Sequence, residues 1–114
     1  MTLNEIKNFF HSSHYEYCTV EDLKVGDVYH LQDPDDYRAT NFYGVIEHQC
    51  PTNVSELWDK KYKVVMGKTF FCDEYDKLKL FHARVPVAFD RSLPCRKTSL
   101  QQSSSGRLED VVGR

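Results

Sequence analysis

Residues 19–31 constrain the fold more than any other segment of this chain, because they join an acidic turn to a run of strand-forming residues. Glu21 and Asp22 stand in the turn, Gly26 follows, and residues 25–32 are rich in β-branched and aromatic side chains. Such side chains fit the pleated, half-buried surface of a strand, whereas Gly and Asp favour turns. We therefore expect a turn or one helical turn over residues 19–23 and a strand over residues 25–32.

The chain start has the signature of a short helix. Thr2 and Glu5 have the spacing of a capping box, in which each side chain bonds to a free backbone N–H of the first turn. The pattern predicts a helix over residues 3–11. Its apolar residues recur at three- and four-residue steps and form one stripe that must pack on something: Leu3, Ile6, Phe9 and Phe10.

Most of the remaining chain has strand patterns. Asp33-Pro34-Asp35-Asp36 breaks the chain, and residues 40–49 alternate with period two. A loop is expected over residues 50–55 and a helical turn over 55–60. Gly67 is expected to close a hairpin between residues 62–66 and 69–71. Residues 77–83 and 84–89 read as extended, with Pro86 suited to an edge strand, although residues 75–85 also satisfy helical spacing.

Length and composition point to one folded domain. The chain has 114 residues, of which 40% are hydrophobic and 13% aromatic, which is ordinary for a globular protein and too apolar for a disordered one. Residues 99–106 read Ser-Leu-Gln-Gln-Ser-Ser-Ser-Gly, which is too polar to offset the entropy of ordering. We predict a compact α+β domain over residues 1–96 and a flexible, basic, Ser/Gln-rich tail over residues 97–114.

The run Asp-Leu-Lys-Val-Gly-Asp-Val-Tyr at residues 22–29 resembles the first strand of SH3-like and PUA-like small barrels. In those barrels a loop leads the chain through a Leu and a Gly into the strand. The resemblance implies a fold only, because such barrels host many functions. The expected architecture is therefore a short N-terminal helix packed on a bent antiparallel sheet or on a partly open small β-barrel.

Charge is distributed unevenly along the chain, although the net charge is only −2. Residues 1–36 carry two lysines and eight acidic residues, whereas residues 91–114 carry five basic and two acidic residues. This polarity fits three arrangements: solvated faces, a face that guides a partner, or a tail that folds back on the body.

Cysteine and histidine positions give no clear metal or redox motif. The four cysteines are widely spaced and never form Cys-x-x-Cys, which favours reduced thiols packed as small apolar groups. Five residues offer the nitrogen and sulfur donors that zinc prefers, but their spacing is not that of a structural zinc site: His11, His14, Cys18, His48 and Cys50. We expect no cofactor.

No nucleophile elbow, Gly-rich phosphate loop or comparable catalytic motif is present. The leading hypothesis is a non-enzymatic binding or regulatory module, in the manner of a small accessory protein encoded by a virus or phage. It would modulate or inhibit a partner protein or a nucleoprotein complex. The expected partner-binding residues are the acids of one loop and two aromatic residues: Asp33, Asp35, Asp36, Tyr37 and Trp58. Trp58, the single Trp, is either an interface anchor or part of the core, and the core is the favoured interpretation.

Two alternatives belong to other classes. A nucleic-acid-binding barrel would use lysines interleaved with aromatic residues in the middle of the chain: Lys60, Lys61, Lys63, Lys68, Lys77 and Lys79. A small zinc- or thiol-dependent enzyme would require a bound metal or a thiol of depressed pKa. No apolar run approaches the ~20 residues of a membrane helix and no secretory signal pattern opens the chain, so we expect a cytoplasmic protein without membrane contacts.

Overall fold

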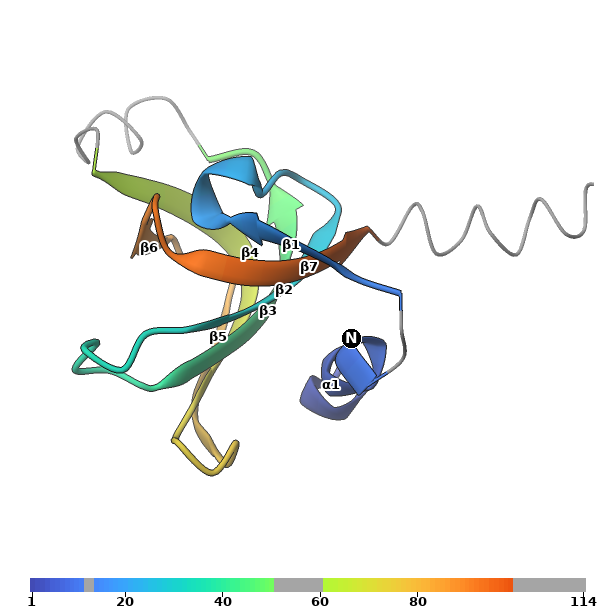
Figure 1. Ribbon diagram of the computed structural model, residues 1–114, viewed down its shortest axis with the longest axis vertical. Helices are drawn as coiled ribbons and strands as arrows, with labels where there is room; N and C mark the ends of the chain where they lie inside the picture. Colours follow the sequence, from blue (N-terminus) through green and yellow to red (C-terminus); the bar gives the residue numbers. More distant parts are fainter. Residues whose placement is uncertain (12–13, 51–60, 100–114) are drawn as a thin grey trace, which may run out of the picture.

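The computed structural model describes residues 1–11, 14–50 and 61–99, which form one α-helix, one 3₁₀ turn and seven strands (Figure 1). In chain order these elements are α1 (Leu3–His11), β1 (Glu16–Thr19), η1 (Val20–Asp22), β2 (Asp27–Gln32), β3 (Asn41–His48), β4 (Tyr62–Cys72), β5 (Leu78–Ala83), β6 (Val87–Asp90) and β7 (Pro94–Ser99).

The strands pair antiparallel in the order β1-β7-β2-β3-β4-β5, and β6 pairs with the first part of β4. The predicted α+β class is confirmed. Among the described strands β1 and β5 stand at opposite ends of the order, so the sheet is open and a small barrel is not confirmed.

Helix α1 forms as its capping box predicts. The Thr2 backbone N–H donates to Glu5 Oε1 at 2.8 Å, and the Glu5 backbone N–H donates to Thr2 Oγ1 at 3.2 Å. Ile6 and Phe10, from the predicted stripe, are buried and the helix packs on β2 and β3. Burial of two such side chains contributes about 1.5–3 kcal/mol each, so tertiary packing as well as capping holds this nine-residue helix.

The sheet buries side chains on both faces. On one face the core contains Tyr29, Leu31 and Phe42, together with side chains from β4, β6 and β7. On the other face α1 covers a second cluster that includes Val28 and Tyr43. The alternation predicted for residues 40–49 is therefore confirmed, and β2 is buried on both faces because it lies between α1 and the core.

Strand β4 continues without interruption through Gly67, so the hairpin predicted at this position is wrong. Gly67 has φ +149°, and a Cβ atom here would overlap the carbonyl oxygen of Val45 on β3. The register between β3 and β4 shifts at this level, between Ile46 and His48. Across this shift β3 advances by two residues and β4 by one, so β3 carries the extra residue of a β-bulge opposite the positive-φ Gly67, and such a bulge bends and twists the paired strands locally. Gly67 therefore marks a bend inside one strand.

The segment that pairs antiparallel with β4 is divided into two strands, β5 and β6, opposite this bend. β5 pairs with residues 68–72 of β4, and β6 pairs with residues 62–65, so β6 lies near the start of β4 and β5 near its end (Figure 1). Between them Arg84 has φ +61° and donates its backbone N–H to the Gly67 carbonyl at 2.9 Å. The extended reading of residues 77–83 is confirmed, and the helical alternative for residues 75–85 is wrong.

Two strands were not predicted from the sequence. β1 and β7 pair with each other, and β7 also pairs with β2. Residues 97–99 belong to β7, so the predicted tail boundary at residue 97 is wrong, because pairing with β2 orders this polar segment through Ser99. The rest of the predicted tail, and the helical turn expected over residues 55–60, lie outside the described residues.

The bend at Gly67 predicts unequal costs for two glycine substitutions. Gly67→Ala should lower the free energy of unfolding by about 3 kcal/mol or more, because its Cβ meets backbone atoms that cannot move aside. Gly26→Ala, at φ +97° with open space around the Cβ position, should lower it by only about 1 kcal/mol. Urea denaturation of both variants measures the difference, and equal costs would contradict the bend.

Candidate functional site

Strand β5 is an edge strand with exposed apolar side chains. Leu78, Leu80 and Phe81 are 51%, 49% and 44% exposed, and no described strand pairs with the outer side of β5. Sheet edges are usually protected by charges, prolines or a covering element. Exposed apolar side chains on an unpaired edge therefore make β5 a candidate interface.

The exposed side chains of β5 extend over both faces of the sheet. Phe81 stacks on Phe70 with ring centroids 4.7 Å apart, on the face that α1 covers elsewhere. Leu80 stands opposite Phe71 in the ladder, and the His82 ring lies 5.0 Å from the Phe71 ring on the core face. A strand added beside β5 would therefore contact apolar side chains on both faces of the sheet.

A groove of about 370 Å³ lies where β5 and β6 separate, near the lower end of the range of ligand pockets. Its lining comes from β4, β5, β6, the break between β5 and β6, and the loop before β3. The lining residues are Tyr37, Arg38, Phe71, Leu80, His82, Val85, Pro86 and Val87.

Arg38 is held in place beside this groove. It forms an ion pair with Asp36 at 2.7 Å, and its guanidinium lies 5.4–5.7 Å from the ring centroids of Phe42, Phe71 and Phe89. Burial opposes ionisation of Asp36, but the hydrogen bonds from Arg38 outweigh it, so the pKa of this carboxyl lies below its usual range. Asp36 is thus a structural partner of Arg38 and is not available as a recognition acid.

The structure brings one of the five predicted partner-binding residues to the groove. Tyr37 lines it and is 93% exposed. Asp33 accepts the backbone N–H of Asp35 at 3.1 Å and so stabilises a turn. Trp58 lies outside the described residues. The apolar side chains of β5 were missed, although their period-two pattern was visible, because exposure on both faces depends on the neighbouring strands.

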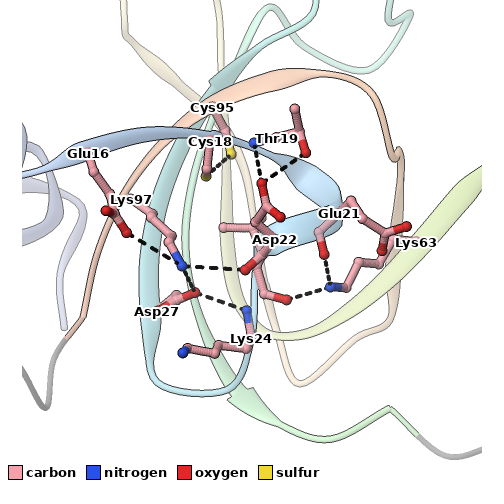
Figure 2. Close-up of polar contacts among 11 residues, drawn as sticks. Glu16, Cys18, Thr19, Glu21, Asp22, Lys24, Asp27, Lys63, Cys95 and Lys97 are labelled. Atoms are coloured by element: carbon pink, nitrogen blue, oxygen red, sulfur yellow. Dashed lines mark hydrogen bonds and ion pairs between the residues drawn. The ribbon is translucent and has the colours of Figure 1, made fainter.

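Three of the six predicted nucleic-acid-binding lysines bond to backbone carbonyls of this chain. Lys63 Nζ donates to Glu21 O at 2.8 Å and to Leu23 O at 2.5 Å (Figure 2). Lys68 Nζ donates to Met1 O at 3.4 Å and Lys79 Nζ to Arg38 O at 3.1 Å.

Of the other three lysines, the structure describes two. Lys61 lies over the Tyr62 ring, Lys77 is exposed in the chain entering β5, and Lys60 lies outside the described residues. Four of the five described lysines of this set therefore make contacts within the chain, each with a different partner.

The donors considered for zinc are spread over the molecule. His11 ends α1, Cys18 is on β1, His48 ends β3 and Cys50 follows it, while His14 lies in the segment before β1. Within residues 1–11, 14–50 and 61–99, no group of three or more His, Cys, Asp or Glu side chains is arranged to hold a metal ion.

A buried polar network surrounds His30 on β2. Arg96 Nε and Nη2 lie 3.0 and 2.6 Å from His30 Nδ1. Because a guanidinium only donates, Nδ1 accepts, so the ring proton is on Nε2 and is donated to Asn41 Oδ1 at 3.0 Å. The ring also stacks on Tyr43 with centroids 4.3 Å apart, and Tyr43 donates its hydroxyl to Asp76. This network joins β2, β3, β7 and the β4–β5 turn.

The His30 network is suited to holding strands together rather than to proton transfer with a ligand. His30 is only 8% exposed. Burial lowers the pKa of His30, and the nearby Arg96 cation acts in the same direction. A second ring proton would point Nδ1–H at the guanidinium and break both hydrogen bonds from Arg96.

No known family model, no curated protein and no solved structure matches this chain. The geometry of the site is therefore the only source for the functional proposal. In the described part of the chain no helix is both long enough and apolar enough to span a membrane.

The neutral state of His30 predicts acid sensitivity. Its pKa is lower in the folded state, so the unfolded chain takes up the proton first as pH falls below the ordinary value of 6.5. The free energy of unfolding should therefore decrease below pH 6.5, by up to ~1.4 kcal/mol per pH unit from this group. Urea titrations between pH 7.5 and 5 measure the slope.

The matched variant is His30→Gln, whose neutral amide can still donate to Asn41 and accept from Arg96. It should show a shallower decrease of stability over the same pH range. Equal slopes for the two proteins would assign the acid sensitivity to other groups.

Proposed function

We propose that this protein is a non-enzymatic binding module that captures an extended segment of a partner protein as an added strand on β5. The observation that carries the proposal is the exposed apolar edge formed by Leu78, Leu80 and Phe81. In strand addition, main-chain hydrogen bonds supply affinity and side-chain contacts supply specificity. A regulator or inhibitor of this kind acts by occupying a segment that its partner uses elsewhere.

The charge around β5 indicates the chemistry of the captured segment. Residues 77–85 read Lys-Leu-Lys-Leu-Phe-His-Ala-Arg-Val and contain three basic residues and no acidic one. An added strand that carries acidic as well as apolar residues would complement this edge. Pairing of β5 with β5 of a second copy would place like charges together, which disfavours self-association.

The groove next to β5 adds a specificity element. An added strand would run past Leu80 toward the break between β5 and β6, where Tyr37 and Val85 line the opening. An apolar side chain of the partner would fill the groove, and the Tyr37 ring would cover it. Aromatic residues in such positions contribute strongly to binding.

Two observations favour this proposal over the alternatives. The lysine contacts within the chain reduce the number of ammonium groups that could neutralise phosphates, which argues against a nucleic-acid partner. Burial raises the pKa of all four cysteines, that of Cys72 to about 11, whereas a thiol-dependent enzyme needs a fast catalytic thiol of lowered pKa. The likeness of residues 22–29 to small barrels stays a prediction and carries no part of the proposal.

A library of random peptides of about ten residues, displayed on phage, tests the proposal directly. The full-length protein should enrich sequences with alternating apolar residues and several acidic residues. Leu80→Glu should weaken binding of an enriched peptide by about 100-fold, because it removes an apolar contact and adds a charge like that of the peptide. Fluorescence anisotropy measures the affinity.

Tyr17→Glu is the matched control, because Tyr17 is an aromatic side chain, 77% exposed, on the opposite edge strand β1. The affinity of this variant for the enriched peptide should equal that of the unaltered protein. The proposal is wrong if the library yields no binders, if the enriched peptides are basic, or if Tyr17→Glu and Leu80→Glu weaken binding equally.

A further inference from the structure

The cysteine pair between β1 and β7 lies outside the site described above. Cys18 and Cys95 stand directly opposite each other in the antiparallel ladder, and their Sγ atoms are 3.0 Å apart (Figure 2). A covalent disulfide has an S–S length of ~2.05 Å, so the two sulfurs need to approach by about 1 Å. The chain between them is long, since the two residues are 77 positions apart.

Contacts around the pair hold the two strands in this register. Glu16 and Lys97 form the neighbouring cross-strand pair, with Lys97 Nζ 3.7 Å from Glu16 Oε1. Lys97 Nζ also lies 3.3 Å from Oδ2 of the buried Asp27 on β2 (Figure 2). One ammonium thus joins β1, β7 and β2 beside the thiols and helps to hold Cys18 opposite Cys95.

The two thiols differ in access. Cys95 is buried, with 4% of its surface exposed, whereas Cys18 is only partly buried. A small reagent therefore reaches Cys18 first, and Cys95 is placed to react with whatever forms there. This is the arrangement of an attacking and a resolving cysteine.

We propose that Cys18 and Cys95 form a reversible disulfide with a low-molecular-weight disulfide such as oxidised glutathione as the oxidant. The Cys18 thiolate attacks the glutathione disulfide, forms a mixed disulfide and releases one glutathione thiolate. Cys95 Sγ, after losing its proton, attacks Cys18 Sγ and releases the second glutathione. The two protein thiols are oxidised, one glutathione disulfide is reduced, and the two thiol protons end on the two glutathione molecules.

Oxidation of Cys18 and Cys95 would link β1 covalently to β7 and so hold the N-terminal part of the chain on the sheet. β1 is a four-residue edge strand and holds to the sheet through β7. A cross-link between positions so far apart restricts the unfolded chain strongly. Burial raises the pKa of both thiols, so the exchange is slow at neutral pH and faster at alkaline pH. The pair is thus a slow thiol–disulfide switch on the stability of β1.

The test uses the full-length protein in excess oxidised glutathione at about pH 8.5, where thiolate is more abundant. Mass spectrometry after alkylation should show that two of the four cysteines are protected from the reagent. Peptide mapping should show a disulfide between Cys18 and Cys95. The melting temperature should rise by about 10 °C and return after treatment with dithiothreitol.

Two variants serve as controls. Cys50→Ala keeps the pair and should oxidise like the unaltered protein, whereas Cys95→Ala should stop at a stable glutathione adduct on Cys18. The proposal fails if all four thiols of the unaltered protein stay reduced, if Cys18 joins a different cysteine, or if the cross-linked protein melts at the same temperature as the reduced one.

Discussion

The close approach of Gly67 to the Val45 carbonyl is the constraint on which the rest of the structure depends. Only a residue without a Cβ fits there, so β4 continues through this point and bends instead of turning back. The bend lets the two parts of one strand pair with different neighbours, β6 first and then β3 and β5. The exposed edge of β5 and the groove beside it both follow from this arrangement, because the segment that pairs with β4 separates into β5 and β6 opposite Gly67.

Polar contacts join the strands of the curved sheet in addition to its apolar packing. His30 and Arg96 join β2 to β7, and Lys97 with Asp27 joins the same two strands farther along. Each of these charged or polar groups has a partner of matching chemistry, as buried polar groups require. The polar sequence of β7 is thereby explained, since its side chains complete networks that start on other strands.

Local signals predicted α1 and β3 well, because a capping box and a period-two pattern depend on adjacent residues alone. The hairpin at Gly67 was mispredicted because Gly67 beside Lys68 reads locally as a turn, and the contact that overrides this reading comes from Val45 on another strand. β7 was missed because its residues are mostly polar. At the candidate site Tyr37 was found from its acidic, turn-forming surroundings, whereas exposure of Leu80 and Phe81 depends on the order of strands.

Hydrogen exchange of the full-length protein, with and without an acidic apolar peptide selected by it, tests the central claim that β5 is the binding edge. Amides in an added strand pair exchange slowly because their hydrogens become bonded to the partner. The account predicts new protection at residues 78–83 and none at residues 16–19 of the opposite edge. Protection that appears at residues 16–19, or a bound peptide that leaves residues 78–83 unchanged, would contradict it.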